Sequence, residues 1–206
     1  MSAAPKHITP DDPNVGRRMT AEEWLDLCEA TGIKYERHNG VVVRPPEGMS
    51  GARRDHNRAA GTTLAYLDRV FAEAGDVCEV FTSDQAVHCE ALSKDVYPDV
   101  SAVCGEQRYA DKDEDRLLAN PSLVIEVQSE STTAYDHTDK LEIYAAIPSV
   151  REYVLIDPHR VRAELLRRQE AGWNMQVFTS LKDEVDLASV GVRLPLKAVY
   201  RRIDAA

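Results

Sequence analysis

The sequence is poor in the features that mark membrane proteins, zinc proteins and exported proteins. None of its apolar runs reaches the 18 or more residues that a membrane-spanning helix needs. Its four cysteines include no C-x-x-C pair, and its six histidines have no H-x-x-x-H or H-x-H spacing, so neither a zinc site nor a disulfide framework is expected. The first 18 residues lack the apolar core of a signal peptide. We therefore expect a cytoplasmic chain with reduced cysteines and a flexible segment at residues 1–18.

Positive charge is also scarce, because 25 lysines and arginines stand against 35 aspartates and glutamates, for a net charge of −10. A protein that binds nucleic acid through its phosphates usually has a basic face. Here such a face must be local. Two arginine-rich runs could supply it, GARRDHNR (51–58) and RVRAELLRR (160–168), although ordinary solvated surface explains both runs equally well.

The chain does have enough apolar residues to fold. With 206 residues, 43% of them apolar and 29% charged, it can bury one core. It shows no internal repeat and no domain boundary, so residues 19–206 are predicted to form a single domain.

Hydrophobic periodicity and turn signals predict an alternation of helices and strands. Helices are expected at 19–30, where Thr20 and Glu23 have capping-box spacing, at 54–74 and at 131–147. Residues 107–121 read as an exposed loop. Hairpins and strands are expected at 33–45, which turns at Asn39-Gly40, at 77–90, 95–105, 121–128, 151–158 and 161–180, and in the tail.

The segments at 121–128, 132–146 and 151–157 form a strand–helix–strand unit, which places two strands side by side and parallel. The other strands read as antiparallel. The predicted fold class is therefore α/β (α+β mixed): a mixed sheet flanked by helices, with extra antiparallel hairpins.

The strand PSLVIEVQSE (121–130) carries two polar side chains where a core strand should be apolar. Glu126 and Gln128 share a face with Val124, because side chains alternate along a strand. An unpaired carboxylate in a dry core costs several kcal/mol. Either this face lies at the wet end of the sheet, or Glu126 points into a cleft and binds a cation.

A second carboxylate, Asp99, lies in VYPDVSAV (96–103) directly after Pro98, which marks a strand edge, a strand start or a bulge. Carboxylates on two neighbouring strands can form an oxygen-lined pocket for Mg²⁺. Lys140 lies on the helix that follows Glu126. Its spacing fits an ordinary ion pair with Asp136 on a wet helix face, and it also allows the amine to reach back over the strand end.

Pro98-Asp99, followed by Glu126-Val127-Gln128, resembles the PD-(D/E)-x-K nuclease motif. With YERHNG, PSLVIEVQSESTTAYDHTDKLEIY and REYVLIDP, the chain resembles the Uma-two family of restriction-endonuclease-like proteins over about residues 19 to 195. The chain departs from the superfamily motif at Gln128, where a lysine is expected. In this branch a lysine of the following helix takes that place, and Lys140 fits the position.

The resemblance implies a restriction-endonuclease-like fold, a metal-dependent endonuclease acting on DNA, and a homodimer. The active-site group that it implies comprises Glu36, Asp99, Glu126, Gln128 and Lys140. Asp99, Glu126 and the backbone carbonyl of Val127 would hold Mg²⁺ or Mn²⁺, and the metal would lower the pKa of a bound water.

Among the remaining groups, Lys140 would position the water or stabilise charge on the phosphate. Gln128 could orient the water. Glu36 would complete the ligand set, although it also fits an ordinary surface position on a hairpin strand. The alternative to an enzyme is a catalytically inactive nuclease-fold protein that binds protein or nucleic acid. The missing motif lysine and the acidic charge favour that alternative, and the presence of Asp99, Glu126 and Lys140 opposes it.

Overall fold

The computed structural model describes residues 12–44, 54–110, 115–129 and 133–205. The first eleven residues of the segment expected to be flexible lie outside these ranges. Residues 12–18 are described and lie beside strand β2 (Val41–Val43), where the amide of Gly16 donates to the carbonyl of Val42 at 2.8 Å. The domain boundary at residue 19 stays a prediction.

The largest sheet has six strands in the order β11-β10-β9-β8-β6-β3. Its central strand β8 (Leu123–Val127) runs parallel to β9 (Glu152–Asp157) and antiparallel to β6 (Val100–Cys104). The parallel pair confirms the predicted strand–helix–strand unit. The other strands are β3 (Cys78–Thr82), β10 (Arg162–Gln169) and β11 (Gly172–Phe178).

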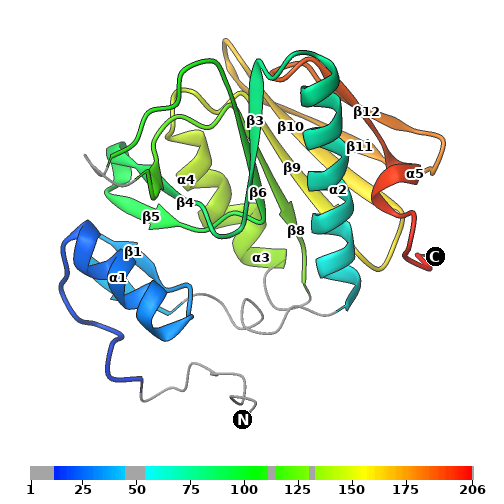
Figure 1. The fold of residues 1–206 in the computed structure, drawn as a ribbon. Helices are drawn as coiled ribbons and strands as arrows, with labels where there is room; N and C mark the ends of the chain where they lie inside the picture. Colours follow the sequence, from blue (N-terminus) through cyan, green and yellow to red (C-terminus); the bar gives the residue numbers. More distant parts are fainter. Residues whose placement is uncertain (1–11, 45–53, 111–114, 130–132, 206) are drawn as a thin grey trace.

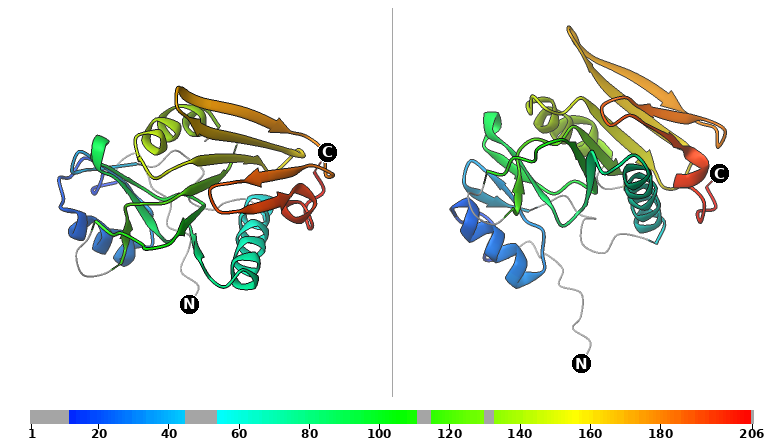
Figure 2. Two further views of the ribbon diagram at one scale, coloured as in Figure 1. Left: turned by 90° about the horizontal axis from the view of Figure 1, so that it is seen from above. Right: turned by 45° about the horizontal axis from the view of Figure 1, so that its top comes forward.

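The two faces of β8 enter two different cores, as the alternation of its side chains requires. Leu123, Ile125 and Val127 pack in the core that contains α2 (Arg54–Glu73), while Val124 packs in the core that contains α4 (Leu141–Ala145). Figure 2 shows α4 on one side of the sheet and α2 on the other. The C-terminal elements add to the α2 side: β12 (Glu184–Leu187), β13 (Val192–Pro195) and α5 (Leu196–Val199).

A second sheet has five strands in the order β2-β1-β5-β4-β7 and is covered by α1 (Ala21–Thr31), drawn in blue in Figure 1. Thr20 and Glu23 form the predicted capping box of α1. The predicted turn at Asn39-Gly40 joins β1 to β2, and both residues have positive φ (52° and 77°), as a tight hairpin turn requires. The strands are β1 (Glu36–His38), β2 (Val41–Val43), β4 (Ala86–Cys89), β5 (Lys94–Val96) and β7 (Leu117–Leu118).

Two predictions about local structure were wrong in part. The segment 107–121, expected to be an exposed loop, contains β7, whose two leucines are buried because they pair in parallel with β4. The strand expected at 95–105 is divided at Tyr97, Pro98 and Asp99 into β5 and β6, which belong to different sheets. Residues 97–99 therefore pass from one sheet to the other and place Asp99 between them.

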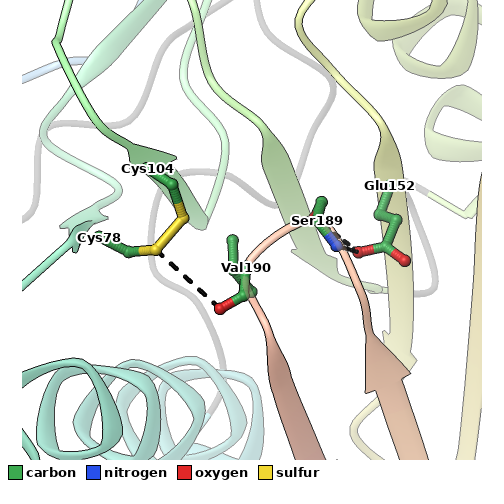
Figure 3. The surroundings of a disulfide bond; sticks show 5 residues. All are labelled: Cys78, Cys104, Glu152, Ser189 and Val190. Carbon is green, nitrogen blue, oxygen red and sulfur yellow. Dashed lines mark hydrogen bonds between the residues drawn. A yellow bond between two sulfur atoms is a disulfide. The ribbon is translucent and has the colours of Figure 1, made fainter. Parts of the chain in front are cut away.

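The prediction of reduced cysteines was wrong for Cys78 and Cys104, which form a disulfide between β3 and β6 (Figure 3). The antiparallel register makes them direct cross-strand partners, with Cα atoms 3.9 Å apart. A separation of 26 residues in the sequence gives no hint of this pairing. Cys28 and Cys89 are free and buried. None of the described helices is both long and apolar enough to cross a bilayer.

Candidate active site

Glu126, the polar residue that interrupts the apolar strand β8, is almost fully buried, with 3% of its surface exposed. Its Oε1 atom accepts hydrogen bonds from Lys140 Nζ and from the Tyr144 hydroxyl, both at 2.7 Å. Two charged or polar donors thus offset the cost of burying this carboxylate. The reading in which Glu126 lies at a wet sheet end does not describe the structure.

Asp99 lies directly before β6 and bridges the ends of two strands. Its Oδ2 atom accepts a hydrogen bond of 2.8 Å from the backbone amide of Val127, and the Nε2 atom of His56 lies 3.2 Å from the same oxygen. Asp99 is therefore held beside the end of β8 from one side by the strand and from the other by the first turn of α2. In Figure 1, β8 ends near α3 (Thr133–Tyr135) and the lower half of α2.

Lys140 comes from a π-helical turn, η2 (Asp136–Lys140), between α3 (Thr133–Tyr135) and α4. The predicted ion pair with Asp136 is present, at 4.0 Å from Nζ to Oδ1, but the pair is buried rather than on a wet face. Lys140 is 2% exposed, and its shortest ion pair is with Glu126. The helix therefore directs the amine back to the strand that precedes it.

Glu36 is not a surface residue, since only 1% of its surface is exposed. It lies on β1, and its Oε2 atom accepts a hydrogen bond of 2.5 Å from the Tyr135 hydroxyl and lies 3.0 Å from Nε2 of His38. Its Oε1 atom is buried without a hydrogen-bond partner among the described residues. Because Tyr135 directly precedes η2, Glu36 joins the second sheet to the helix that carries Lys140.

Gln128 follows β8 on the same face as Glu126 and is buried. Its side-chain amide nitrogen lies 3.3 Å from Nδ1 of His137. The other nitrogen of that ring, Nε2, lies 3.0 Å from a carboxylate oxygen of Glu164 on β10. Because Nδ1 of His137 donates to the carbonyl of Thr133 at 2.7 Å, the Gln128 amide lies beside this ring without a hydrogen bond to it.

Burial and charge set the protonation of this group of residues. Burial raises the pKa of Glu126 to about 8, and the positive charge of Lys140 only partly opposes this. Burial acts to lower the pKa of Lys140, but the carboxylates of Glu126 and Asp136 outweigh burial and raise it. The two pKa values therefore rise for different reasons: burial raises that of Glu126, and the neighbouring acids raise that of Lys140.

Asp99 differs from Glu126 in this respect. Burial acts to raise the pKa of Asp99, but the hydrogen bond and charge of His56 outweigh it, so the pKa of Asp99 lies below its ordinary value. Four acidic side chains act on Lys140, with His56 as the second potential cation: Glu36, Asp99, Glu126 and Asp136. Even with Glu126 protonated the acids outnumber these two cations, which makes the group attractive to a further cation.

The donor types in this group suit magnesium or manganese, which prefer oxygen ligands. In the ranges that the structure describes, no three His, Cys, Asp or Glu side chains are arranged to hold a metal by themselves. Magnesium commonly takes only one or two protein carboxylates and fills its other positions with water and substrate phosphate. The buried, unpartnered Oε1 of Glu36 also calls for a positive partner. On these observations the residues fit a hard divalent cation.

Comparison with known proteins identifies the family of this fold and site. The family model described as "Putative restriction endonuclease", Uma2, matches residues 21–197. The chain belongs to the Uma2 family. An uncharacterized protein of Synechocystis is 27% identical to this Uma2 chain over 184 residues, covering 89% of this chain and 92% of its own length. A second uncharacterized Synechocystis protein is 31% identical over 167 residues, covering 81% and 89%.

The fold of this Uma2 protein also matches a solved structure. A crystal structure from Anabaena variabilis, described as a "putative nuclease belonging to DUF820", aligns with a TM-score of 0.64 at 16% identity. The alignment covers 81% of this chain and 89% of the other. At this identity the match shows the fold alone. It supports the predicted mixed sheet flanked by helices.

Three residues of the candidate site in this Uma2 protein were not predicted from the sequence: His56, Tyr135 and Tyr144. No local pattern connects His56 to Asp99, 43 positions later. Tyr135 and Tyr144 lie within the helix predicted at 131–147. The spacing of Lys140 and Tyr144, four residues apart, was the available signal, because it places both on one helix face. The bond between Tyr135 and Glu36 depends on the second sheet lying beside the helix, which no sequence pattern expresses.

Proposed function

We propose that this Uma2 protein is a Mg²⁺- or Mn²⁺-dependent endonuclease that hydrolyses phosphodiester bonds in DNA. The observation that carries the proposal is the convergence of Asp99, Glu126 and Lys140 at the ends of β6 and β8, through the Asp99–Val127 and Glu126–Lys140 hydrogen bonds. Membership of the Uma2 family and a fold shared with a nuclease-like protein support the same reading.

In this proposal Asp99, Glu126 and the backbone carbonyl of Val127 would hold the metal, and Glu36 would complete the ligand set. The metal would supply a polarised phosphodiester and a water of lowered pKa. Val127 and His56 fix the Asp99 carboxylate through its Oδ2 atom, so that the ligand is oriented before the cation arrives.

Lys140 would contribute positive charge at the substrate phosphate. It is an ammonium group with a raised pKa, so it stays charged at neutral pH and acts as an electrostatic group rather than a base. Gln128, which lies beside His137, would orient the attacking water through its amide. In this proposal two residues take the place of the motif lysine: Gln128 orients the water and Lys140 carries the positive charge.

Other expected properties stay predictions. A homodimer is proposed from the habit of the superfamily of cutting two strands with paired subunits, and a molar mass in solution would test it. The cytoplasmic location also stays a prediction. The Cys78–Cys104 disulfide does not favour it, because such bonds are more common in oxidising compartments.

Metal binding and cleavage test the proposal together. Millimolar Mn²⁺ is expected to raise the melting temperature of the wild type and not of Asp99→Asn or Glu126→Gln, because a ligand that binds only the folded state stabilises it. Asp68→Asn is a matched control, since Asp68 is an exposed acid on α2. Supercoiled plasmid and single-stranded DNA should be cut by the wild type and by the control only.

The two parts of the test separate the alternatives. Stabilisation by Mn²⁺ without cleavage of either substrate would favour the catalytically inactive, binding-module alternative. Equal stabilisation of the wild type and Asp99→Asn would remove the metal site, and with it the proposed function.

A further inference from the structure

The structure separates the two arginine-rich runs of the sequence. In the run 160–168 every arginine is engaged in the protein's own contacts. Arg160 and Arg162 pair with Asp157 and Glu164 at 2.8 Å, Arg167 pairs with Glu152 at 2.7 Å, and Arg168 donates to three backbone carbonyls. Since these charges are already neutralised or occupied, this run is a poor candidate for a phosphate-binding face.

The run that begins α2 has a different environment. Arg54 and Arg58 lie one turn apart on the same side of the helix. Arg58 donates from Nη1 to the backbone carbonyl of Arg202 at 2.7 Å, and one turn later Thr62 donates from its hydroxyl to the carbonyl of Val199 at 2.7 Å. These two bonds hold the C-terminal segment, drawn in red in Figure 1, beside the N-terminal half of α2.

The C-terminal segment brings two more arginines to this place. Arg201 and Arg202 are exposed, as is Arg54, and none of the three forms a side-chain ion pair among the residues that the structure describes. We call Arg54, Arg201 and Arg202 the basic rim, which Arg58 supports through its bond to the carbonyl of Arg202. The acids close to these residues in the chain are Asp55, which lies 3.6 Å from Arg58, and Asp204. The rim is thus locally positive on a chain whose net charge is −10.

The position of the basic rim relative to the candidate active site follows from helix geometry. His56, two residues from both Arg54 and Arg58, contacts Asp99. At about 100° per residue, Arg54 and Arg58 lie on the side of α2 away from His56, and the helix is roughly 10 Å across. The rim therefore lies beside the metal-binding group but outside direct contact with it.

We propose that the basic rim binds the phosphate backbone of DNA at nucleotides that flank the cleaved phosphate. This inference rests on the proposed function and names the surface that would hold its substrate. Because the rim lies a helix width from Asp99, it contributes to binding and not to the chemical step. Its arginines would supply the local basic face that the composition of the chain requires.

The test compares Arg201→Ala/Arg202→Ala with a control that loses the same charge, Arg69→Ala/Arg108→Ala. Arg69 lies on the same helix, about 16 Å along its axis from Arg58, and Arg108 is an exposed arginine of another segment. Binding of a labelled duplex is measured by anisotropy in Ca²⁺ from 50 to 300 mM KCl, with the duplex checked on a gel for cleavage.

A plot of the logarithm of the DNA association constant against the logarithm of salt concentration has a negative slope. Each lost phosphate contact makes this slope shallower by about 0.9, which corresponds to roughly eightfold weaker binding at 0.1 M salt. The rim variant should therefore lose about 1.8 in slope and roughly 60-fold in affinity, whereas the control should change little. At saturating DNA in Mg²⁺, the kcat of the rim variant should equal that of the wild type.

Three outcomes would overturn the inference. Equal slopes for the two double variants would mean that the basic rim contacts no phosphate. A fall in kcat at saturating DNA would place these arginines in the chemistry instead. Loss of binding to anionic lipid vesicles with unchanged DNA binding would assign the rim to a membrane surface. A wild type that neither binds nor cleaves DNA would refute the proposed function itself. The equal slopes and the fall in kcat are distinct from that result, because both require a wild type that binds or cleaves DNA.

Discussion

Replacing Lys140 by methionine removes the one ammonium group that several buried carboxylates share, while keeping a side chain of similar length. Lys140 is 2% exposed and lies 2.7 Å from Glu126 and 4.0 Å from Asp136. The substitution therefore asks whether this lysine belongs to a cation-binding site or to an ordinary ion pair. We expect Lys140→Met to lower the stability of the metal-free protein, to strengthen metal binding and to abolish cleavage.

The loss of stability without metal should be modest. Removing one partner of a buried ion pair can cost about 3 to 5 kcal/mol. Glu126 limits this cost by staying protonated, because its pKa is already about 8 and would rise further without Lys140. At pH 7, holding a glutamate neutral costs about 3 kcal/mol relative to an ordinary pKa of 4.5, and the wild type already bears most of that cost.

What the variant loses in addition is the hydrogen bond between Lys140 and Glu126, worth about 1.5 to 3 kcal/mol. For a chain of this size, 1 kcal/mol shifts the melting temperature by roughly 2 to 4 °C. The expected fall is therefore about 3 to 12 °C in EDTA.

Metal binding should move in the opposite direction. A divalent ion and an ammonium about 5 Å apart repel by roughly 7 kcal/mol at an effective dielectric constant of 20. Even a fifth of that repulsion, about 1.4 kcal/mol, corresponds to a tenfold change in Kd. We expect Mn²⁺ to bind Lys140→Met at least about tenfold more tightly than the wild type.

The assay is thermal unfolding across a Mn²⁺ titration, with plasmid cleavage measured on the same samples. Lys182→Met is the control, because Lys182 is exposed. The reasoning is refuted if the Lys140 variant melts like the wild type in EDTA and gains no more stability from Mn²⁺. Cleavage at the wild-type rate would refute the role given to the ammonium group.

Two further predictions concern His56 and the disulfide. His56→Leu should weaken Mn²⁺ binding, measured by calorimetry, by about 10- to 100-fold, which is the usual effect of losing a group that orients a metal ligand. His56→Gln keeps a hydrogen-bond donor for Asp99 and should bind Mn²⁺ nearly as tightly as the wild type does. Equal affinities for the two variants would exclude this positioning role. Reducing the Cys78–Cys104 bond, which encloses 26 residues, should lower the free energy of unfolding by roughly 3 to 4 kcal/mol in urea titrations. Cys78→Ser should show the same loss without a reductant, and an unchanged urea midpoint in both would contradict the prediction.

Local patterns predicted the elements that carry the site. The parallel pair of β8 and β9 followed from two apolar strands around a helix, and the hairpin of β1 and β2 followed from Asn39-Gly40. The alternation along β8 also placed Glu126 and Gln128 on one face. These features depend on residues close together in the sequence, or on the direction in which a strand–helix–strand unit returns to the sheet. They can therefore be predicted from a single sequence.

The features that could not be predicted depend on how distant segments meet. The contact of His56 with Asp99 requires α2 to pack beside the end of β8, and the bond of Tyr135 to Glu36 requires the second sheet to lie beside the helix. The Cys78–Cys104 bond requires the register of β3 against β6. Charge sharing among buried groups is a property of that packing, which is why the burial of Asp136 and Lys140 was open from spacing alone.

The π-helical turn that carries Lys140 affects how the site can be recognised in distant relatives. A π-helical turn holds one residue more than an α-helical turn. A relative that lost one residue between positions 136 and 140 would keep the same residue types in order, yet its lysine would be rotated by about 100° away from the strand end. Counting positions from the strand glutamate to the helix lysine is therefore a poor guide to whether two family members share an active site. The direction in which the helix presents the amine is the criterion to compare.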